Sequence, residues 1–283
     1  MQKIAFDDLP SYSDRVKTLL YSPHPLASRS ISSTNREYEI ETWGRLLSKF
    51  SPTETLTCST VENSLVDPKI PTVIHHLGDT YIATEAESLS LHLKALYDEI
   101  FPFIRYSTQL VEIGAGFGSK IFGLVDAYPD HLSAIPLLAY EYTTSGRELI
   151  SRIGNNYPLF TKAHQFSFFE ETFLFPDISE GSVIFTSYAA CYSQNRCHSF
   201  LNALLARRPR RVIHLEPVIE SYQQNTLSGI LYAKYLTDNH YSSDLVPSLS
   251  RMTSDNLITS TFKPNVISTN PLMPCSLISW SPK

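Results

Sequence analysis

The sequence predicts an α/β fold in which helices cover both faces of a mostly parallel sheet. From Gln109 onward, short apolar runs alternate with stretches of helical periodicity, which is typical of parallel strands joined by helices. The last segment instead contains two extended runs, which predict an antiparallel pair at one end of the sheet. With 283 residues, of which 42% are hydrophobic, the chain is long enough to form a large packed core.

Seven apolar runs are the candidate strands of this sheet. They cover residues 110–113, 136–141, 164–169, 182–188, 211–216, 257–263 and 275–281. Helical periodicity falls between or after the first five runs, at residues 119–128, 145–157, 197–206 and 222–238. The first five strands are expected to be parallel, and the last two form the antiparallel C-terminal hairpin.

The chain changes character near residue 107. Before it, the pattern favours helices at residues 14–20, 35–50 and 85–104, the last broken around Pro102, with a Ser-, Thr- and Pro-rich loop at residues 51–71. We therefore predict an N-terminal helical cap of residues 1–106 and a sheet domain of residues 107–283.

Charge and composition exclude several classes of protein. The formal net charge of −5 disfavours a protein that wraps bare nucleic-acid backbone. The N-terminus lacks the apolar run of a signal peptide, and no stretch has the roughly 20 apolar residues of a membrane-spanning helix. Four cysteines without a paired framework predict free thiols and a reducing, cytoplasmic compartment. The sequence does not predict the oligomeric state.

The most informative motif is a glycine-rich turn that follows the first strand. The segment 110–118 reads LVEIGAGFG, so three alternating glycines let the backbone turn sharply and approach a ligand. A dinucleotide fingerprint would need a third glycine at position 119, where this chain has Ser119. A tight strand-to-helix turn without a ligand is the alternative interpretation.

The spacing E-x-G-x-G-x-G, formed by Glu112, Gly114, Gly116 and Gly118, resembles the first motif of the class I S-adenosylmethionine-dependent methyltransferases. This resemblance implies a Rossmann-like fold and S-adenosyl-L-methionine as cofactor, with Ala115 inside the binding turn. It covers about residues 107–283.

The resemblance also implies roles for residues at the ends of later strands. Glu141 would hold the ribose hydroxyls, because a carboxylate accepts two hydrogen bonds from a diol, and Tyr142 would pack on the adenine. Glu170 would lie near the adenine amino group, with its neighbour Glu171 as an alternative. Ser187 would contact the cofactor where the methionine moiety meets the acceptor. A solvated loop carboxylate is the alternative for Glu141.

Three residues are candidates for the chemistry of methyl transfer. Tyr188 and Glu216 follow the fourth and fifth strands, at the edge where open α/β sheets bind ligands. Glu216 is equally interpretable as a carboxylate that binds loop amides. His198 is a weaker acid or base candidate, whereas His214 lies inside a strand and is expected to be a core residue. No metal site is expected.

The N-terminal region is expected to form a lid over donor and acceptor. Tyr38 and Arg36 lie on one predicted helix and are candidate substrate contacts, whereas Trp43 on the same helix is expected to pack against the sheet's helices. His75 and His76 point to opposite faces of one strand, so they cannot bind one ion together.

Together these features predict an enzyme that methylates an oxygen or nitrogen atom of a small molecule. One alternative is methylation of a protein or peptide side chain, which requires an open groove. Another is a non-catalytic protein that binds the nucleotide on the same fold. A nucleic-acid partner is not expected, although Arg207, Arg208, Arg210 and Arg211 form a basic run.

Overall fold

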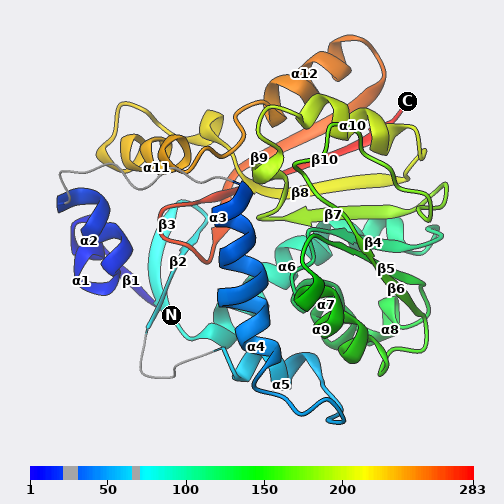
Figure 1. Ribbon diagram of the computed structural model, residues 1–283. Helices are drawn as coiled ribbons and strands as arrows, with labels where there is room; N and C mark the ends of the chain where they lie inside the picture. The colour runs from blue at the N-terminus through cyan, green and yellow to red at the C-terminus, as the bar shows by residue number, and fades with distance from the viewer. Residues whose placement is uncertain (22–30, 66–70) are drawn as a thin grey trace.

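A computed structural model describes residues 1–21, 31–65 and 71–283 of the chain. The described strands form one mixed sheet with helices on both faces, as Figure 1 shows, which confirms the predicted α/β class. In their order of pairing, the strands are β1 (Gln2–Ile4), β3 (Asp79–Ala83), β2 (Thr72–His76), β9 (Ile258–Ser268), β10 (Cys275–Pro282), β8 (Arg211–Pro217), β7 (Val183–Ser187), β4 (Leu110–Ile113), β5 (Leu137–Glu141) and β6 (Phe160–Gln165).

Strands β4 to β8 pair in parallel, whereas β9 and β10 are antiparallel to their neighbours. The antiparallel tail is therefore confirmed, but it does not end the sheet. Strand β9 also pairs with β2, so three N-terminal strands extend the sheet beyond the tail. The expectation of seven strands is wrong for this reason, because the sheet has ten strands within the described residues.

His75 and His76 were expected on a strand, but neither its hairpin with β3 nor its place in the sheet was predicted, and this hairpin carries an unusual turn. Strands β2 and β3 are joined at Leu77 and Gly78, which both have positive φ angles, 51° and 88°. Two-residue hairpin turns with both central residues at positive φ usually contain Asn or Asp with Gly, and Leu rarely adopts this conformation. The N-terminal region is consequently not a purely helical cap, and strands from both sides of residue 107 share the sheet.

Two hydrophobic layers enclose the sheet. Helices α6 (Glu85–Ile104), α7 (Ser119–Ala127) and α9 (Thr144–Gly154) cover one face, and α10 (Cys197–Leu205) and α12 (Leu245–Ser254) cover the other. A third cluster joins α1 (Leu9–Tyr12), α2 (Asp14–Tyr21) and α11 (Leu227–Asp238) to β2. Helix α12 was not predicted, and α11 begins five residues later than expected.

The third parallel strand lies earlier than the sequence predicts. The apolar run 164–169 indicated a strand, but β6 covers Phe160–Gln165 and has a largely exposed polar pattern. Phe166 and Phe168 follow the strand and pack in the cluster beneath α10. An edge strand needs no buried apolar run, so the strongest apolar signal marked the packed loop instead.

The segment 31–47 is helical, as predicted in part, but it is not a regular α-helix. It consists of α3 (Ile31–Asn35), a π-helical stretch η2 (Arg36–Gly44) and α4 (Arg45–Leu47). A Cβ atom on Gly44 would lie 2.3 Å from the carbonyl oxygen of Glu39, so glycine allows this wider turn. The predicted loop at 51–71 contains α5 (Cys58–Asn63), and residues 66–70 of that prediction lie outside the described residues.

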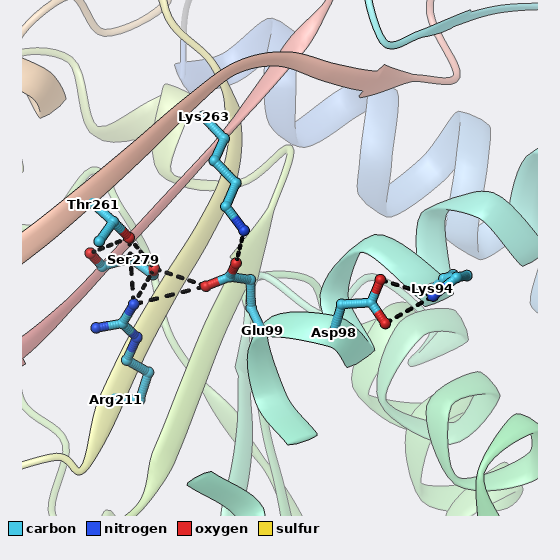
Figure 2. Close-up of polar contacts among 7 residues, drawn as sticks. All are labelled: Lys94, Asp98, Glu99, Arg211, Thr261, Lys263 and Ser279. Carbon is cyan, nitrogen blue, oxygen red and sulfur yellow. Dashed lines mark hydrogen bonds and ion pairs between the residues drawn. The ribbon is translucent and has the colours of Figure 1, made fainter. Parts of the chain in front are cut away.

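Helix α6 anchors the N-terminal region to the sheet. It begins with a capping box between Thr84 and Glu87 and continues through Pro102 to Ile104, so the predicted break is absent. Figure 2 shows the Glu99 carboxylate of α6, which forms an ion pair with Lys263 of β9 and accepts a hydrogen bond from the hydroxyl of Ser279 of β10 (3.0 Å). The guanidinium of Arg211 lies 3.7 Å from the same carboxylate. This ion cluster joins α6 to three strands.

No helix in the described part of the chain is both long and apolar enough to cross a membrane. The four cysteines are free and buried, as expected for thiols that serve as small core residues.

Candidate functional site

A cavity of about 260 Å³ lies where β4, β5 and β7 end. Three sets of residues line it: the ends of these strands, the loop after β6, and the helical segment 31–47. Among the sequence-predicted residues, the lining includes Tyr38, Glu112, Gly114, Ala115, Gly116, Glu141, Tyr142, Ser187 and Tyr188. The topology places them together because parallel strands present their carboxyl ends at one edge of the sheet.

The glycine turn forms the floor of the cavity. Gly114 and Gly116 have φ angles of 78° and 59°, a region that L side chains rarely adopt. The amides of Gly114 and Ala115 both donate to the carbonyl of Tyr140, at 2.8 and 3.0 Å, which holds the turn against the end of β5.

Gly118 lies away from the cavity, contrary to its predicted role in cofactor contact. Its φ angle is 85°, and it forms the N-cap of α7. A Cβ atom there would lie 2.6 Å from the Phe122 ring, so this glycine is required by helix packing.

Glu141 ends β5 beside the glycine turn and is nearly buried. Its Oε2 atom accepts the Gly116 amide (2.8 Å), and its Oε1 atom accepts the amide and hydroxyl of Thr143 (2.9 and 2.6 Å). Burial raises the pKa of Glu141, and these hydrogen bonds oppose the rise. The carboxylate is thus held rigidly at the cavity wall, and one acceptor position on Oε2 is left for a ligand.

A second carboxylate, Glu112, lies deeper at the same site. It is buried and accepts the Ile121 amide at 3.0 Å. Burial raises its pKa to about 8, which the charge of Lys120 opposes. Lys120 also lines the cavity and was not predicted, because a lone lysine in a helix sequence reads as a solvated residue.

The helical segment 31–47 lines the cavity and packs against the glycine turn, where a Cβ atom on Gly116 would lie 2.8 Å from the Trp43 ring. A π-helix pairs residues five apart, so Tyr38 and Trp43 lie one turn apart on one face, with their rings stacked 6.3 Å apart. Trp43 contacts Phe117 edge-on at 5.5 Å, and the Tyr38 hydroxyl lies 2.6 Å from that of Tyr192. Trp43 therefore lines the cavity as well as packing, which was not expected.

Glu39 holds this segment in place. Its carboxylate accepts the amides of Thr144 and Ser145 (2.6 and 3.1 Å) at the start of α9. A carboxylate at a helix N-terminus satisfies unpaired amides and complements the helix dipole. Arg36, in contrast, is exposed and pairs with Glu41 at 2.8 Å, so it does not reach the cavity as predicted.

Tyr188 contributes its ring to the cavity, whereas its hydroxyl points elsewhere. The hydroxyl donates to Ser268 Oγ and accepts the Thr269 amide, both at 2.9 Å. Burial raises the pKa of Tyr188 well above its ordinary value. A non-glycine φ of 54° indicates local strain at this wall. The expected catalytic use of the hydroxyl does not fit this geometry.

Glu216 is fully buried and does not line the cavity, which corrects its predicted catalytic role. Its carboxylate accepts the amides of Ala189, Ala190 and Cys191 at 2.9–3.3 Å. The alternative interpretation, a carboxylate that binds loop amides, is the one the structure supports. Glu216 shapes the wall indirectly, because the loop that it holds contains Ala189.

Two other predicted residues also lie outside the cavity lining. Glu170 is exposed after β6, where its charge contributes to a raised pKa of Tyr142 after the larger effect of burial. His198 is half-buried on α10. Within the described residues, no three His, Cys, Asp or Glu side chains are grouped to hold a metal ion. The buried His92, which pairs with the predicted Ser187, was missed, because α6 is distant in sequence from β7.

No protein-family model matches the chain, and no curated protein matches it. Three solved structures of methyltransferases are similar. Magnesium protoporphyrin IX methyltransferase from Synechocystis, solved with S-adenosylhomocysteine, has a TM-score of 0.46 and 8% identity, over 71% of this chain and 89% of that one. The O-methyltransferase TomG from Streptomyces achromogenes, solved with S-adenosylmethionine, has a TM-score of 0.41 and 17% identity, over 71% of this chain and 81% of that one. The small RNA methyltransferase HEN1 has a TM-score of 0.49 and 12% identity, over 71% of this chain and 26% of that one. At TM-scores below 0.5, we draw nothing about the function of this chain from them.

Proposed function

We propose that this chain is a class I S-adenosylmethionine-dependent methyltransferase that methylates an oxygen or nitrogen atom of a small molecule. The observation that carries the proposal is the juxtaposition of the glycine turn and Glu141 on one cavity. Gly114 and Gly116 expose backbone at its floor, and the buried Glu141 carboxylate lies 2.8 Å from the Gly116 amide.

The residues around the cavity fit a nucleoside with a polar tail. Glu141 has one acceptor position left, on Oε2, for a ribose hydroxyl, because Gly116 and Thr143 occupy the other three. Tyr142, Phe168 and Phe169 line the side of the cavity next to Glu141, where aromatic rings suit a purine base. Lys120 and Ser187 supply polar groups toward β7. When bound, S-adenosylmethionine supplies a methyl group activated by the sulfonium charge.

The chain's own contribution to transfer is positioning and exclusion of water. Tyr38, Trp43 and Tyr192 present aromatic surface to the cavity, so they can align an acceptor and cover it. The aromatic side chains that line the cavity support a small, partly apolar acceptor.

Isothermal titration with S-adenosylmethionine and S-adenosylhomocysteine tests cofactor use. We expect both to bind with one site per chain. If neither compound binds to the folded protein, the proposal is refuted.

The acceptor class needs a separate experiment. We expect radiolabelled methyl groups from S-adenosylmethionine to be incorporated into metabolite pools. Incorporation only into peptides would contradict the small-molecule assignment and leave the cofactor assignment intact. A Glu141→Ala variant gives the background in both pools.

A further inference from the structure

A buried histidine contacts the cavity through a serine. His92 lies on α6 with no exposed surface, and its Nε2 atom is 2.8 Å from the Oγ atom of Ser187. Ser187 is the last residue of β7 and lines the cavity. The other ring nitrogen of His92, Nδ1, is buried and has no hydrogen-bond partner among the described residues. The imidazole therefore makes one directed contact, and that contact is to a cavity residue.

The neighbouring residue on β7, Thr186, makes a similar contact with a second buried histidine, His214. Thr186 points to the opposite face of β7, where its Oγ1 atom lies 2.9 Å from Nδ1 of His214. The Trp280 indole donates to Nε2 of His214 at 3.1 Å, so Nδ1 must carry the proton and donate to Thr186. The Thr186 hydroxyl then donates to the Glu216 carboxylate, where this bond lowers the pKa of Glu216 against the effect of burial.

The same logic assigns the direction of the His92 contact. Buried N–H groups without an acceptor are rarer in proteins than acceptors without a donor. The network therefore assigns the hydrogen to Nε2, which donates to Ser187 and leaves Nδ1 as the unpartnered acceptor. Burial lowers the pKa of His92 well below its ordinary value, which keeps the ring neutral with a single N–H. The Ser187 hydrogen is then free to point into the cavity.

The Thr186 hydroxyl thus donates its hydrogen to Glu216, whereas the Ser187 hydroxyl has no such carboxylate acceptor among the described residues. We infer that His92 is a positioning residue that holds the Ser187 hydroxyl as a donor to the amino-acid carboxylate of S-adenosylmethionine. This inference rests on the proposed function, and it assigns the end of the cofactor that lies at β7.

Strand order and charge both place the carboxylate at this end. Strand β4 lies between β5 and β7, so Glu141 and Ser187 are separated by two strand spacings, roughly 10 Å. A ligand whose ribose is at Glu141 would extend across the glycine turn toward Ser187. Lys120 lines the cavity, and its charge lies close enough to contribute to the lowered pKa of His92. A cation and a hydroxyl donor together suit a carboxylate.

The test compares S-adenosylhomocysteine with 5′-methylthioadenosine, which has the same nucleoside and sulfur but no amino-acid group. We expect Ser187→Ala and His92→Phe each to weaken S-adenosylhomocysteine binding about tenfold or more, the effect of losing a hydrogen bond to a charged group. Both variants should bind 5′-methylthioadenosine within threefold of the unchanged protein. Isothermal titration on the full chain measures both ligands.

Further variants separate positioning from general damage. His92→Gln, which keeps a donor near the Nε2 position, should restore most of the affinity. The double variant of His92 and Ser187 should lose no more than either single variant, because the two act through one hydrogen bond. His75→Gln is the matched control, since His75 is also buried and pairs with a threonine hydroxyl (2.9 Å to Thr80) but does not line the cavity.

Two results would overturn the inference while leaving the proposed function standing. One is unchanged S-adenosylhomocysteine affinity in folded Ser187→Ala or His92→Phe protein. The other is an equal loss for both ligands. If the unchanged protein binds neither ligand, the proposed function fails and this inference fails with it.

Discussion

Replacing Glu216 with glutamine separates the structural role of this residue from the catalytic role that its sequence position suggested. Both carboxylate oxygens accept backbone amides: Oε1 accepts those of Ala189 and Ala190, and Oε2 accepts those of Ala189 and Cys191. A glutamine offers one oxygen, and its NH₂ group would face an amide that is itself a donor. At least one buried N–H group would then lose its acceptor.

The expected loss follows from these contacts. An unsatisfied buried donor costs about 1–3 kcal/mol, and loss of charge-assisted bonds adds a similar amount, so we expect unfolding free energy to fall by about 3 kcal/mol. For a chain of 283 residues, that corresponds to a decrease in Tm of roughly 5 °C. Thermal unfolding followed by circular dichroism measures it. Glu180→Gln is the control, because it removes a carboxylate that is 69% exposed.

A different result would restore the catalytic interpretation. If Glu216→Gln had an unchanged Tm and unchanged cofactor affinity but a large loss of turnover, then Glu216 would handle a proton. That outcome would refute the assignment of its carboxylate to the loop amides.

Three further predictions concern the elements around the site. Burial acts to raise the pKa of Glu99, but Lys263 and its other partners lower it overall below its ordinary value of 4.5. Its stabilising effect is therefore present above pH 4.5 and is lost as pH falls below 4.5 through the lowered folded-state pKa, and Glu99→Gln should flatten the dependence of Tm on pH there. Glu39→Ala should increase hydrogen exchange across residues 36–47, whereas Glu41→Ala should not; equal exchange would contradict the anchoring role. Gly118→Ala should lower Tm more than Gly78→Ala, because a Cβ atom on Gly118 would lie 2.6 Å from the Phe122 ring, whereas one on Gly78 would meet nothing within 4 Å. Equal decreases in Tm would argue against the packing role of Gly118.

Much of the fold could be predicted because its strands carry strong local signals. Four of the five parallel strands coincide with buried apolar runs of the sequence, and the glycine turn joins β4 to α7. The place of the N-terminal strands in the sheet could not be found in this way, because β2 joins the sheet by pairing with β9 across nearly 200 residues. Local patterns contain no information on such a distant partner.

The residues of the candidate site also differ in how far local sequence could predict them. Glu141 was identified through the resemblance of the glycine motif, which implies an acidic residue at the end of the next strand, and parallel pairing places that residue beside the glycine turn. Glu216 was misassigned because sequence position gives the edge of the sheet but not the face on which a side chain lies. His92 and Trp43 come from elements outside the nucleotide motif, so only the tertiary structure brings them to the cavity.

The central claim is that the glycine turn and Glu141 together bind the nucleoside of S-adenosylmethionine. Titration of S-adenosylhomocysteine into the unchanged protein and into folded Glu141→Ala protein tests it most directly. We predict one-site binding by the unchanged protein and at least tenfold weaker binding by the variant, because a hydrogen bond to a charged group is lost. Equal affinity of the two proteins would contradict the account.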